Sequence, residues 1–161
     1  MPQFEGLNIA VITISDRAHA GAYQDISGPL IAQRFADVGA TVMQQVVVPD
    51  DVKAIADEIR HGAIADVIIT TGGTGVAPRD VTPEATKQFL ELELPGVAEA
   101  LRAHGVKSNP MAAIGRGLAG FHGRTLIVNL PGSVKAVEES LEILLPIVPH
   151  LVAQRAGHDQ H

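Results

Sequence analysis

Four short segments hold the residues of this sequence whose types and spacing could do chemistry. They are Ser15-Asp16-Arg17, Pro49-Asp50-Asp51, the ten residues TGGTGVAPRD at 71–80, and Pro131-Gly132-Ser133. Glycine-rich main chain offers N–H donors to an anion, whereas the aspartates would repel one. A divalent cation carrying a phosphate ligand reconciles the two, because Mg²⁺ is commonly held by one or two carboxylates together with substrate phosphates. The pattern therefore predicts a metal and phosphate site.

Within this site, Asp50 and Asp80 are the predicted Mg²⁺ ligands. The turn at 72–75 contains Gly72, Gly73, Thr74 and Gly75, and its glycines would let the main chain approach a phosphate closely. Arg79 could bind the same phosphate through two N–H groups, which favours a metal-phosphate ligand over a salt bridge between Arg79 and Asp80. This turn lacks both the Lys-Ser/Thr of a P-loop and the spacing of a dinucleotide fingerprint.

Turns and helix caps explain some of the same residues without any ligand. A glycine cluster after a strand is often only a tight turn. Asp16 could cap a turn, and Asp50 or Asp51 could N-cap the helix that follows. Asp25 and the segment 27–29 fit loop and cap roles. Capping also fits Gly132-Ser133, although a helix N-terminus is itself an anion site.

The elements that must position these residues follow from the hydrophobic pattern. Runs rich in Val and Ile predict strands at 7–15, 41–48, 66–71 and 126–130. Helices are predicted from Ser27 to 38, from Asp50 or Asp51 to 62, from a Thr82 cap through Phe89 and Leu92, and over 134–151. Shorter helical pieces are expected at 97–102 and 112–118, and a loop at 16–25. Pro146 and Pro149 should kink or split the last helix.

Alternating strands and helices predict an α/β fold, a three-layer α/β/α arrangement with a doubly wound, mostly parallel sheet. In such a sheet the ligand crevice lies outside the carboxyl ends of the strands. All four chemical segments follow predicted strands, so they should meet at one edge.

Composition limits the class of protein. The 161 residues, 46% hydrophobic and 19% charged, suggest one domain over 1–161 with a frayed tail at 156–161. A net charge of -6 without a Lys/Arg block argues against nucleic acid or a membrane as partner. The absence of cysteine excludes disulfides and thiolate metal sites. The first residues lack a secretory pattern, so we expect a cytoplasmic protein.

Three separate motifs resemble one family. TTGGTGVAPRDVTPEAT, ISDRAHAGAYQDISGP and NLPGSVKAVEE are similar to segments of Mog/MoaB-type molybdenum cofactor biosynthesis proteins, which include a domain of gephyrin. They occur in the family's order, and the similarity runs from residue 7 to about 154. The resemblance implies molybdopterin adenylyltransferase activity, in which ATP and molybdopterin give adenylyl-molybdopterin and pyrophosphate with Mg²⁺. It also implies a homotrimer, and a downstream molybdenum-insertion protein as partner.

The same resemblance implies roles for individual residues. Asp50 and Asp80 match the family's two essential aspartates, which makes them the predicted catalytic pair. Ser15, Asp16, Ser27 and Gly28 fall in its nucleotide-site segments. Pro131, Gly132 and Ser133 fall where the pterin substrate is expected, and Val134 stands where the family often has proline.

Other functions remain open at this point. A non-catalytic molybdopterin carrier or scaffold of the MoaB type would keep the fold and the pterin pocket. A receiver-type signalling domain is disfavoured, because its acceptor aspartate should end the third strand, where this sequence has TTGGTG. A nucleotide-binding domain with an unrelated reaction is the third alternative.

Overall fold

Six strands form one mixed sheet in the computed structural model, which describes residues 2–158. The elements in chain order are η1 (Pro2–Phe4), β1 (Asn8–Ile14), α1 (Asp16–His19), α2 (Ser27–Asp37), β2 (Thr41–Val48), α3 (Val52–Gly62), β3 (Val67–Thr71), α4 (Thr82–Lys87), β4 (Leu92–Glu93), α5 (Pro95–Val106), η2 (Pro110–Ile114), β5 (Ala119–His122), β6 (Thr125–Leu130) and α6 (Val134–Arg155). Residues 159–161 of the expected tail lie outside the described residues.

The sheet is mostly parallel, as predicted. Its strand order is β2-β1-β3-β6-β5-β4. Strands β2, β1, β3 and β6 are parallel neighbours, whereas β5 runs antiparallel to both β6 and β4. Since β2 lies on one side of β1 and β3 on the other, the strand order reverses between β1 and β3. Ligands of doubly wound sheets bind at this kind of reversal.

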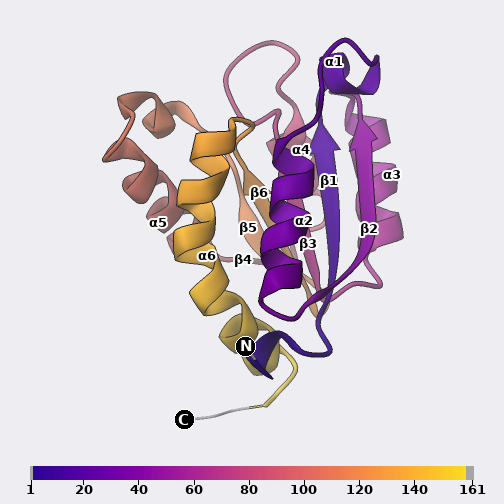
Figure 1. The fold of residues 1–161 in the computed structure, drawn as a ribbon, viewed down its shortest axis with the longest axis vertical. Helices are drawn as coiled ribbons and strands as arrows, with labels where there is room; N and C mark the ends of the chain where they lie inside the picture. The colour runs from indigo at the N-terminus through magenta and orange to yellow at the C-terminus, as the bar shows by residue number, and fades with distance from the viewer. Residues whose placement is uncertain (1, 159–161) are drawn as a thin grey trace.

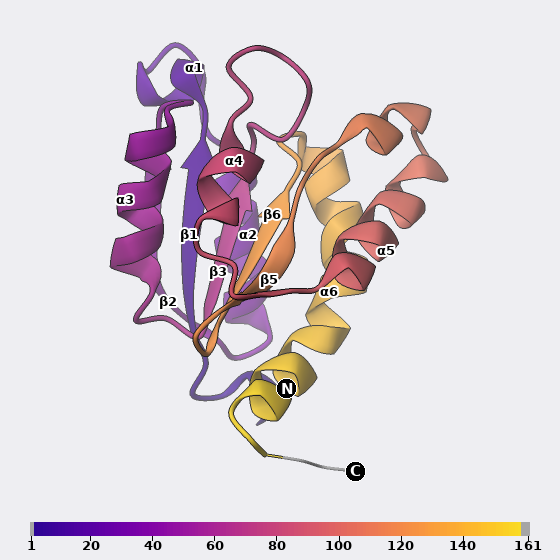
Figure 2. The ribbon, with the colours of Figure 1, turned by 180° about the vertical axis from the view of Figure 1, so that it is seen from behind.

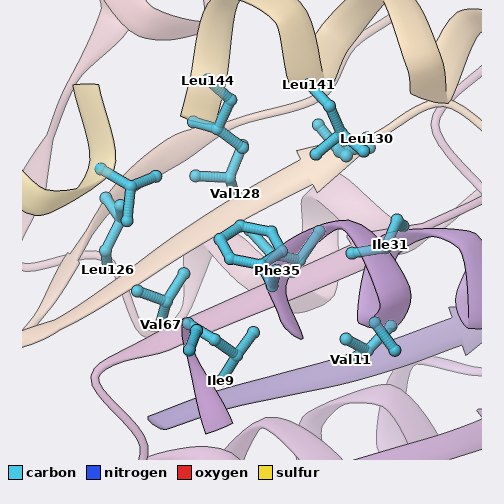
Figure 3. Packing of buried hydrophobic residues seen from close by; sticks show 14 of the residues in the cluster. Ile9, Val11, Ile31, Phe35, Val67, Leu126, Val128, Leu130, Leu141 and Leu144 are labelled. Carbon is cyan, nitrogen blue, oxygen red and sulfur yellow. The ribbon is translucent and has the colours of Figure 1, made fainter. Parts of the chain in front are cut away.

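Helices cover both faces of the sheet, which confirms the three-layer arrangement. Figures 1 and 2 show α2 and α6 on one face, α3 and α4 on the other, and α5 beside α6 near the β4 edge. Figure 3 shows the first core, where Phe35 of α2 and Leu141 and Leu144 of α6 pack over Val67 and Val128 of the sheet. A second core lies beneath α3 and α4. Within residues 2–158, none of the helices combines the length and apolar character needed to cross a bilayer.

Burial explains where the sequence pattern was informative. Strands β3 and β6 are buried at every position, which suits their Ile and Val content because both faces are covered by helices. Strand β2 is the sheet edge, and its exposure alternates along most of its length. On α3, Ile55, Ala56, Ile59 and Gly62 form the buried face.

The region between β3 and β6 differs from the prediction. The helix that begins at Thr82 ends at Lys87, and Leu92, expected on its inner face, lies in β4 instead. Only the first part of the piece expected at 112–118 is helical, as the 3₁₀ turn η2. Strand β5 was not predicted, because Gly120 interrupts its short apolar run. Its position depends on pairing with β6, a contact that local sequence does not encode.

Asn129 fixes this unpredicted edge from within the sheet. Its buried side-chain amide donates to the hydroxyls of Thr70 (2.9 Å) and Thr86 (3.0 Å). The side-chain oxygen of Asn129, Oδ1, accepts a hydrogen bond from the main-chain N–H of Leu118 at 3.0 Å. Asn129 therefore joins β3, β6, α4 and the entry to β5.

One further local prediction was wrong, and of two effects expected at the prolines of α6 one is excluded. A short helix, α1, occupies part of the loop expected at 16–25, because the Ser15 side chain accepts a hydrogen bond from the N–H of Ala18. Helix α6 is not split in two at Pro146 and Pro149. Buried Leu144 and Val148 hold that stretch against the sheet, and their packing outweighs the hydrogen bonds that the prolines lose.

Candidate functional site

All four chemical segments follow β1, β2, β3 and β6, whose carboxyl ends share one edge of the sheet. Figures 1 and 2 show α1 and the loop between β3 and α4 at this same end of the molecule. The predicted meeting of these segments is therefore observed.

The glycine turn after β3 requires glycine for reasons that lie within the protein. Gly72 and Gly73 have φ angles of +98° and +66°, in the left-handed region where other residues are strained. A Cβ on Gly72 would collide with the main-chain oxygen of Ile14 at the end of β1, and one on Gly73 with the Thr82 hydroxyl. A Cβ on Gly75 would lie 2.8 Å from Asp80 Oδ2. Close approach of protein groups thus explains these glycines even without a ligand.

Two threonines fix the turn. Thr82 is not the predicted N-cap, because it lies inside α4 after Val81. Its hydroxyl instead donates to the Gly72 carbonyl at 2.9 Å. The hydroxyl of Thr71 donates to the carbonyl of Pro131 at 2.7 Å. The turn after β3 is therefore tied both to α4 and to the turn after β6.

Asp16 and Asp50 are paired through main chain and side chain. The Asp16 N–H donates to Asp50 Oδ2 (2.9 Å), and the Asp50 N–H donates to Asp16 Oδ1 (3.0 Å). Asp51 N-caps α3 by accepting from the Ala54 N–H at 2.9 Å. Asp51 rather than Asp50 is therefore the helix cap. The other carboxylate oxygen of Asp50, Oδ1, lies beside the glycine turn, 3.0 Å from the position that a Cβ on Gly73 would occupy.

The pKa values of Asp16 and Asp50 are shifted in opposite directions. Partial burial raises the pKa of Asp50 above its ordinary value; the Asp16 N–H opposes this, and the negative charges of Asp16 and Asp80 add to it. Hydrogen bonding from Arg79 lowers the pKa of Asp16 to about 2. The positive charge of Arg79 offsets part of this rise in the pKa of Asp50, and a cation bound near Asp50 and Asp80 would lower it further.

Arg79 contacts Asp16 rather than Asp80. Its Nε and Nη2 atoms donate to the two carboxylate oxygens of Asp16, at 2.5 Å and 2.9 Å. Asp80 accepts from the N–H of Ala77 at 3.0 Å through Oδ2. Because the Arg79 side chain is 66% exposed, an incoming phosphate could reach the guanidinium, and it would compete there with Asp16.

The start of α2 corrects one prediction. Ser27 is not an N-cap but the first residue of α2, and its hydroxyl donates to the carbonyl of Gly132 at 2.7 Å. Asp25 acts at this helix start, accepting from the Gly28 N–H (3.0 Å) and from the Thr13 hydroxyl (2.7 Å). A Cβ on Gly28 would collide with the Thr13 hydroxyl and the Asp25 carboxylate.

The turn after β6 begins α6. Ser133 is the N-cap, and its hydroxyl accepts from the Ala136 N–H at 3.2 Å. Pro131 and Gly132 lie beside the glycine turn, since a Cβ on Gly132 would approach the Gly72 Cα to 3.4 Å. The capping alternative for Ser133 therefore holds, and it leaves the helix N-terminus facing the site edge.

Arg116 is a site residue that the sequence did not reveal. Its Nε donates to the Gly75 carbonyl (2.8 Å) and its Nη2 to the Asp80 carbonyl (2.9 Å). Nη1 and Nη2 also contact the Glu84 carboxylate, at 2.7 Å and 3.2 Å. This arginine clasps both ends of the loop that carries Asp80. A lone arginine between glycines, far along the chain, offered no local signal of that role.

Two cavities lie beside the turns that follow β3 and β6. One, of about 250 Å³, lies between α5, η2 and α6 and reaches Thr74, Gly75, Pro131 and Ser133. The other, of about 130 Å³, is lined by residues that include Ser15, Ser27, Gly72 and Gly132. Ligands in the two cavities would thus approach each other across the turns after β3 and β6.

The donor set fits Mg²⁺ held jointly by protein and substrate. Among the described residues there is no group of three or more His, Cys, Asp or Glu that could hold a metal alone. Asp50 and Asp80 would supply two carboxylates, and phosphates and water would supply the rest, which is the usual pattern for Mg²⁺ in phosphate chemistry.

Comparison with known proteins identifies the family of this chain. Residues 10–150 match the family model described as a probable molybdopterin binding domain. A molybdopterin adenylyltransferase of Helicobacter pylori is 37% identical over 155 residues, covering 91% of this chain and 86% of the relative. The molybdenum cofactor synthesis protein cinnamon of Drosophila melanogaster is 43% identical over 152 residues, but those are 92% of this chain and only 25% of that protein.

Among solved structures, the molybdopterin biosynthesis enzyme MoaB of Thermus thermophilus has a TM-score of 0.85 and 44% identity. That match covers 94% of this chain and 97% of the other. The fold is that of a doubly wound α/β protein, with the candidate site at the carboxyl ends of its parallel strands. The chain belongs to the molybdopterin-binding domain family of molybdenum cofactor biosynthesis.

Proposed function

We propose that this protein catalyses Mg²⁺-dependent transfer of the adenylyl group of ATP to molybdopterin, with release of pyrophosphate. The observation that carries the proposal is the pair of cavities on either side of the turns after β3 and β6. Gly73 and Gly75 of the first turn lie against the carboxylates of Asp50 and Asp80. A nucleotide in one cavity and a pterin in the other would bring their phosphates to the same glycine turn. The names of the adenylyltransferase relatives support the same reaction.

Adenylyl transfer to a phosphate does not need a general base to ionise the acceptor oxygen. In the transfer, an oxygen of the acceptor phosphate forms a bond to the α-phosphorus of ATP, and the bond from that phosphorus to the β-phosphate oxygen breaks. A phosphate monoester has its second pKa near ~6, so the acceptor is already mostly ionised at neutral pH. Repulsion between anions is then the main barrier, and positioning and electrostatics must lower it. This accounts for motifs that contain carboxylates, an arginine and glycines but no well-placed histidine.

Each part of the site edge has a role in this proposal. Asp50 and Asp80 would hold Mg²⁺, which supplies positive charge to the phosphates when bound. The N–H groups of the 72–75 turn, including Thr74, and the guanidinium of Arg79 would bind phosphate oxygens. Ser15, Asp16, Ser27 and Gly28 border the smaller cavity or lie next to it and would contact the nucleotide. Pro131, Gly132 and Ser133 would contact the pterin substrate.

The deciding experiment incubates the protein with molybdopterin, ATP and Mg²⁺ and measures adenylyl-molybdopterin and pyrophosphate. Asp50→Asn and Asp80→Asn keep the size of the side chain and remove its charge, and each should lower turnover by a factor on the order of 100 or more. Asp57→Asn is the matched control, because Asp57 contacts Lys53 and Arg60 on the solvent-facing side of α3. Normal turnover by Asp80→Asn would refute the assignment of that residue.

A non-catalytic molybdopterin carrier is the second candidate. The pairing of Arg79 with Asp16 favours it, because the guanidinium is already satisfied without a phosphate. A carrier would bind molybdopterin without Mg-ATP and release no pyrophosphate, so the same assay separates the two functions.

The proposal also covers the number of subunits, the cell compartment and a partner protein. We propose a homotrimer acting in the cytoplasm and passing its product to a molybdenum-insertion protein. Light scattering of the purified protein would measure the number of subunits.

A further inference from the structure

The larger cavity contains a carboxylate that no interaction in the protein explains. Glu139 lies on α6, is half-buried, and lines the cavity. Within residues 2–158 it has no hydrogen-bond or ion-pair partner. Its neighbours on the same helix are engaged elsewhere: Glu138 lies 3.6 Å from Arg34 of α2, and Glu142 lies 2.9 Å from His104 of α5.

The walls of this cavity suit a flat heterocycle. Ala98 and Leu101 of α5, Met111 and Ile114 of η2, and Pro131 contribute apolar surface. Arg102 is the other charged residue that lines it, and its Nη1 donates to the Gly117 carbonyl at 2.9 Å. Ligand pockets combine apolar walls with a few polar groups that fix orientation. A volume of about 250 Å³ is small for such a pocket and fits a single fused ring system.

Distance along α6 relates Glu139 to the phosphate end of the site. Glu139 lies six positions after the N-cap Ser133, which corresponds to a rise of about 9 Å. A ligand bound to Glu139 at one end would therefore reach the turns after β6 and β3 at the other. Molybdopterin has this form, with a pterin ring at one end and a phosphate at the other.

We infer that Glu139 recognises the 2-amino-4-oxo edge of the pterin ring, which places the pterin in the cavity between α5, η2 and α6 and the nucleotide in the smaller one. The N3–H and the 2-amino group of a pterin are adjacent donors that match the two oxygens of a carboxylate. Adenine cannot make this contact, because its amino group stands beside a ring nitrogen that only accepts. The inference takes from the proposed function only that the substrate is a pterin.

A pair of related ligands tests this contact directly. Pterin has the 2-amino group, whereas lumazine has the same fused ring system with a carbonyl oxygen in its place and a hydrogen on N1. Fluorescence titration of both into the wild-type protein should show pterin binding about 10- to 100-fold more tightly, the range expected for one charge-assisted hydrogen bond. In Glu139→Gln, one side-chain oxygen becomes an N–H donor that faces the pterin amino group and suits the lumazine oxygen. The preference should therefore fall to about one or reverse.

Glu138→Gln is the control, since it removes a charge from the adjacent position, where the side chain pairs with Arg34. It should keep the wild-type preference. The inference is overturned if wild-type protein binds pterin no better than lumazine, or if Glu139→Gln keeps the full preference.

Failure of this inference and failure of the proposed function are distinguishable. Ligand preference is measured without ATP, so a carrier with no turnover would still show it. Conversely, pyrophosphate release by Glu139→Gln with an unchanged KM for molybdopterin would reject the contact and leave the adenylyl transfer standing.

Discussion

Replacement of Arg116 by methionine should loosen the loop between β3 and α4 while leaving the fold intact. The substitution keeps an unbranched apolar side chain and removes the donors to the Gly75 and Asp80 carbonyls. It also removes the contact with Glu84, whose side chain and that of Arg116 are 53% and 37% exposed. Such an exposed ion pair contributes no more than about 1 kcal/mol.

The magnitude follows from the two carbonyl contacts. A hydrogen bond from a charged donor contributes about 1.5–3 kcal/mol when well shielded, and partial exposure reduces each of these to about 1 kcal/mol. The loop should therefore lose about 2 kcal/mol of local stability, which makes its opening about 30-fold more frequent. The N–H groups of Ala77 and Asp80, which are bonded within the loop, report that opening.

Native-state hydrogen exchange of these two amides is the assay. Arg116→Met should accelerate their exchange about 30-fold and leave the amides of β3 and β6 unchanged. Arg155→Met is the control, because Arg155 also donates to a main-chain carbonyl, that of Gly123, on another part of the surface. Unchanged exchange in Arg116→Met, or equal acceleration by the control, would refute the idea that Arg116 clasps this loop.

Three further substitutions test the framework of the site. Hydrogen bonding from Arg116 lowers the pKa of Glu84 below its ordinary value of 4.5. The pair therefore stabilises the fold above pH 4.5, and this stabilisation is lost as the pH falls below that value. Glu84→Gln should remove that part of the acid sensitivity, which urea unfolding at pH 6 and at pH 3 would measure. Gly72→Ala should cost about 1–3 kcal/mol of unfolding free energy, and more than Gly123→Ala, because Gly123 has a positive φ of +57° with open space around it, whereas Gly72 has a φ of +98° and faces the Ile14 carbonyl. Asn129→Ala should cost about 2–4 kcal/mol by leaving buried groups unpaired, and a thermal melt near that of the wild type would contradict this.

The parts of the fold that could be predicted from sequence are those whose signal is local. Four strands were located because β1, β2, β3 and β6 are runs of Val, Ile and Thr of ordinary strand length. The edge β4-β5 was not, because β4 has two residues and β5 contains Gly120, and both depend on partners distant in sequence. Likewise, α6 was expected to kink or split at its prolines, and sequence does not show how much surface its apolar face buries to keep it continuous.

The site shows the same division. The four segments could be placed together, because the carboxyl ends of parallel strands share an edge. Sequence placed the helix cap of α2 on the wrong residue. Asp25, and not Ser27, accepts the hydrogen bond from the Gly28 N–H at the start of α2. The Ser27 hydroxyl instead donates to the carbonyl of Gly132, which is distant in sequence. Arg116 and Glu139 could not be singled out at all, since the role of each depends on which distant groups lie nearby.

The crowding of the glycine turn has a consequence for tracing this family through evolution. Gly72 and Gly73 face the Ile14 carbonyl and the Thr82 hydroxyl, so substitution there damages the fold whether or not the protein has a reaction to perform. A descendant that abandoned catalysis would still be selected to retain both glycines. If Asp50 and Asp80 hold Mg²⁺ as proposed above, they would lose that role in such a descendant and could be substituted. Presence of the glycine motif in a genome therefore marks ancestry, whereas under the proposed function the two aspartates are the positions at which loss of activity would become visible.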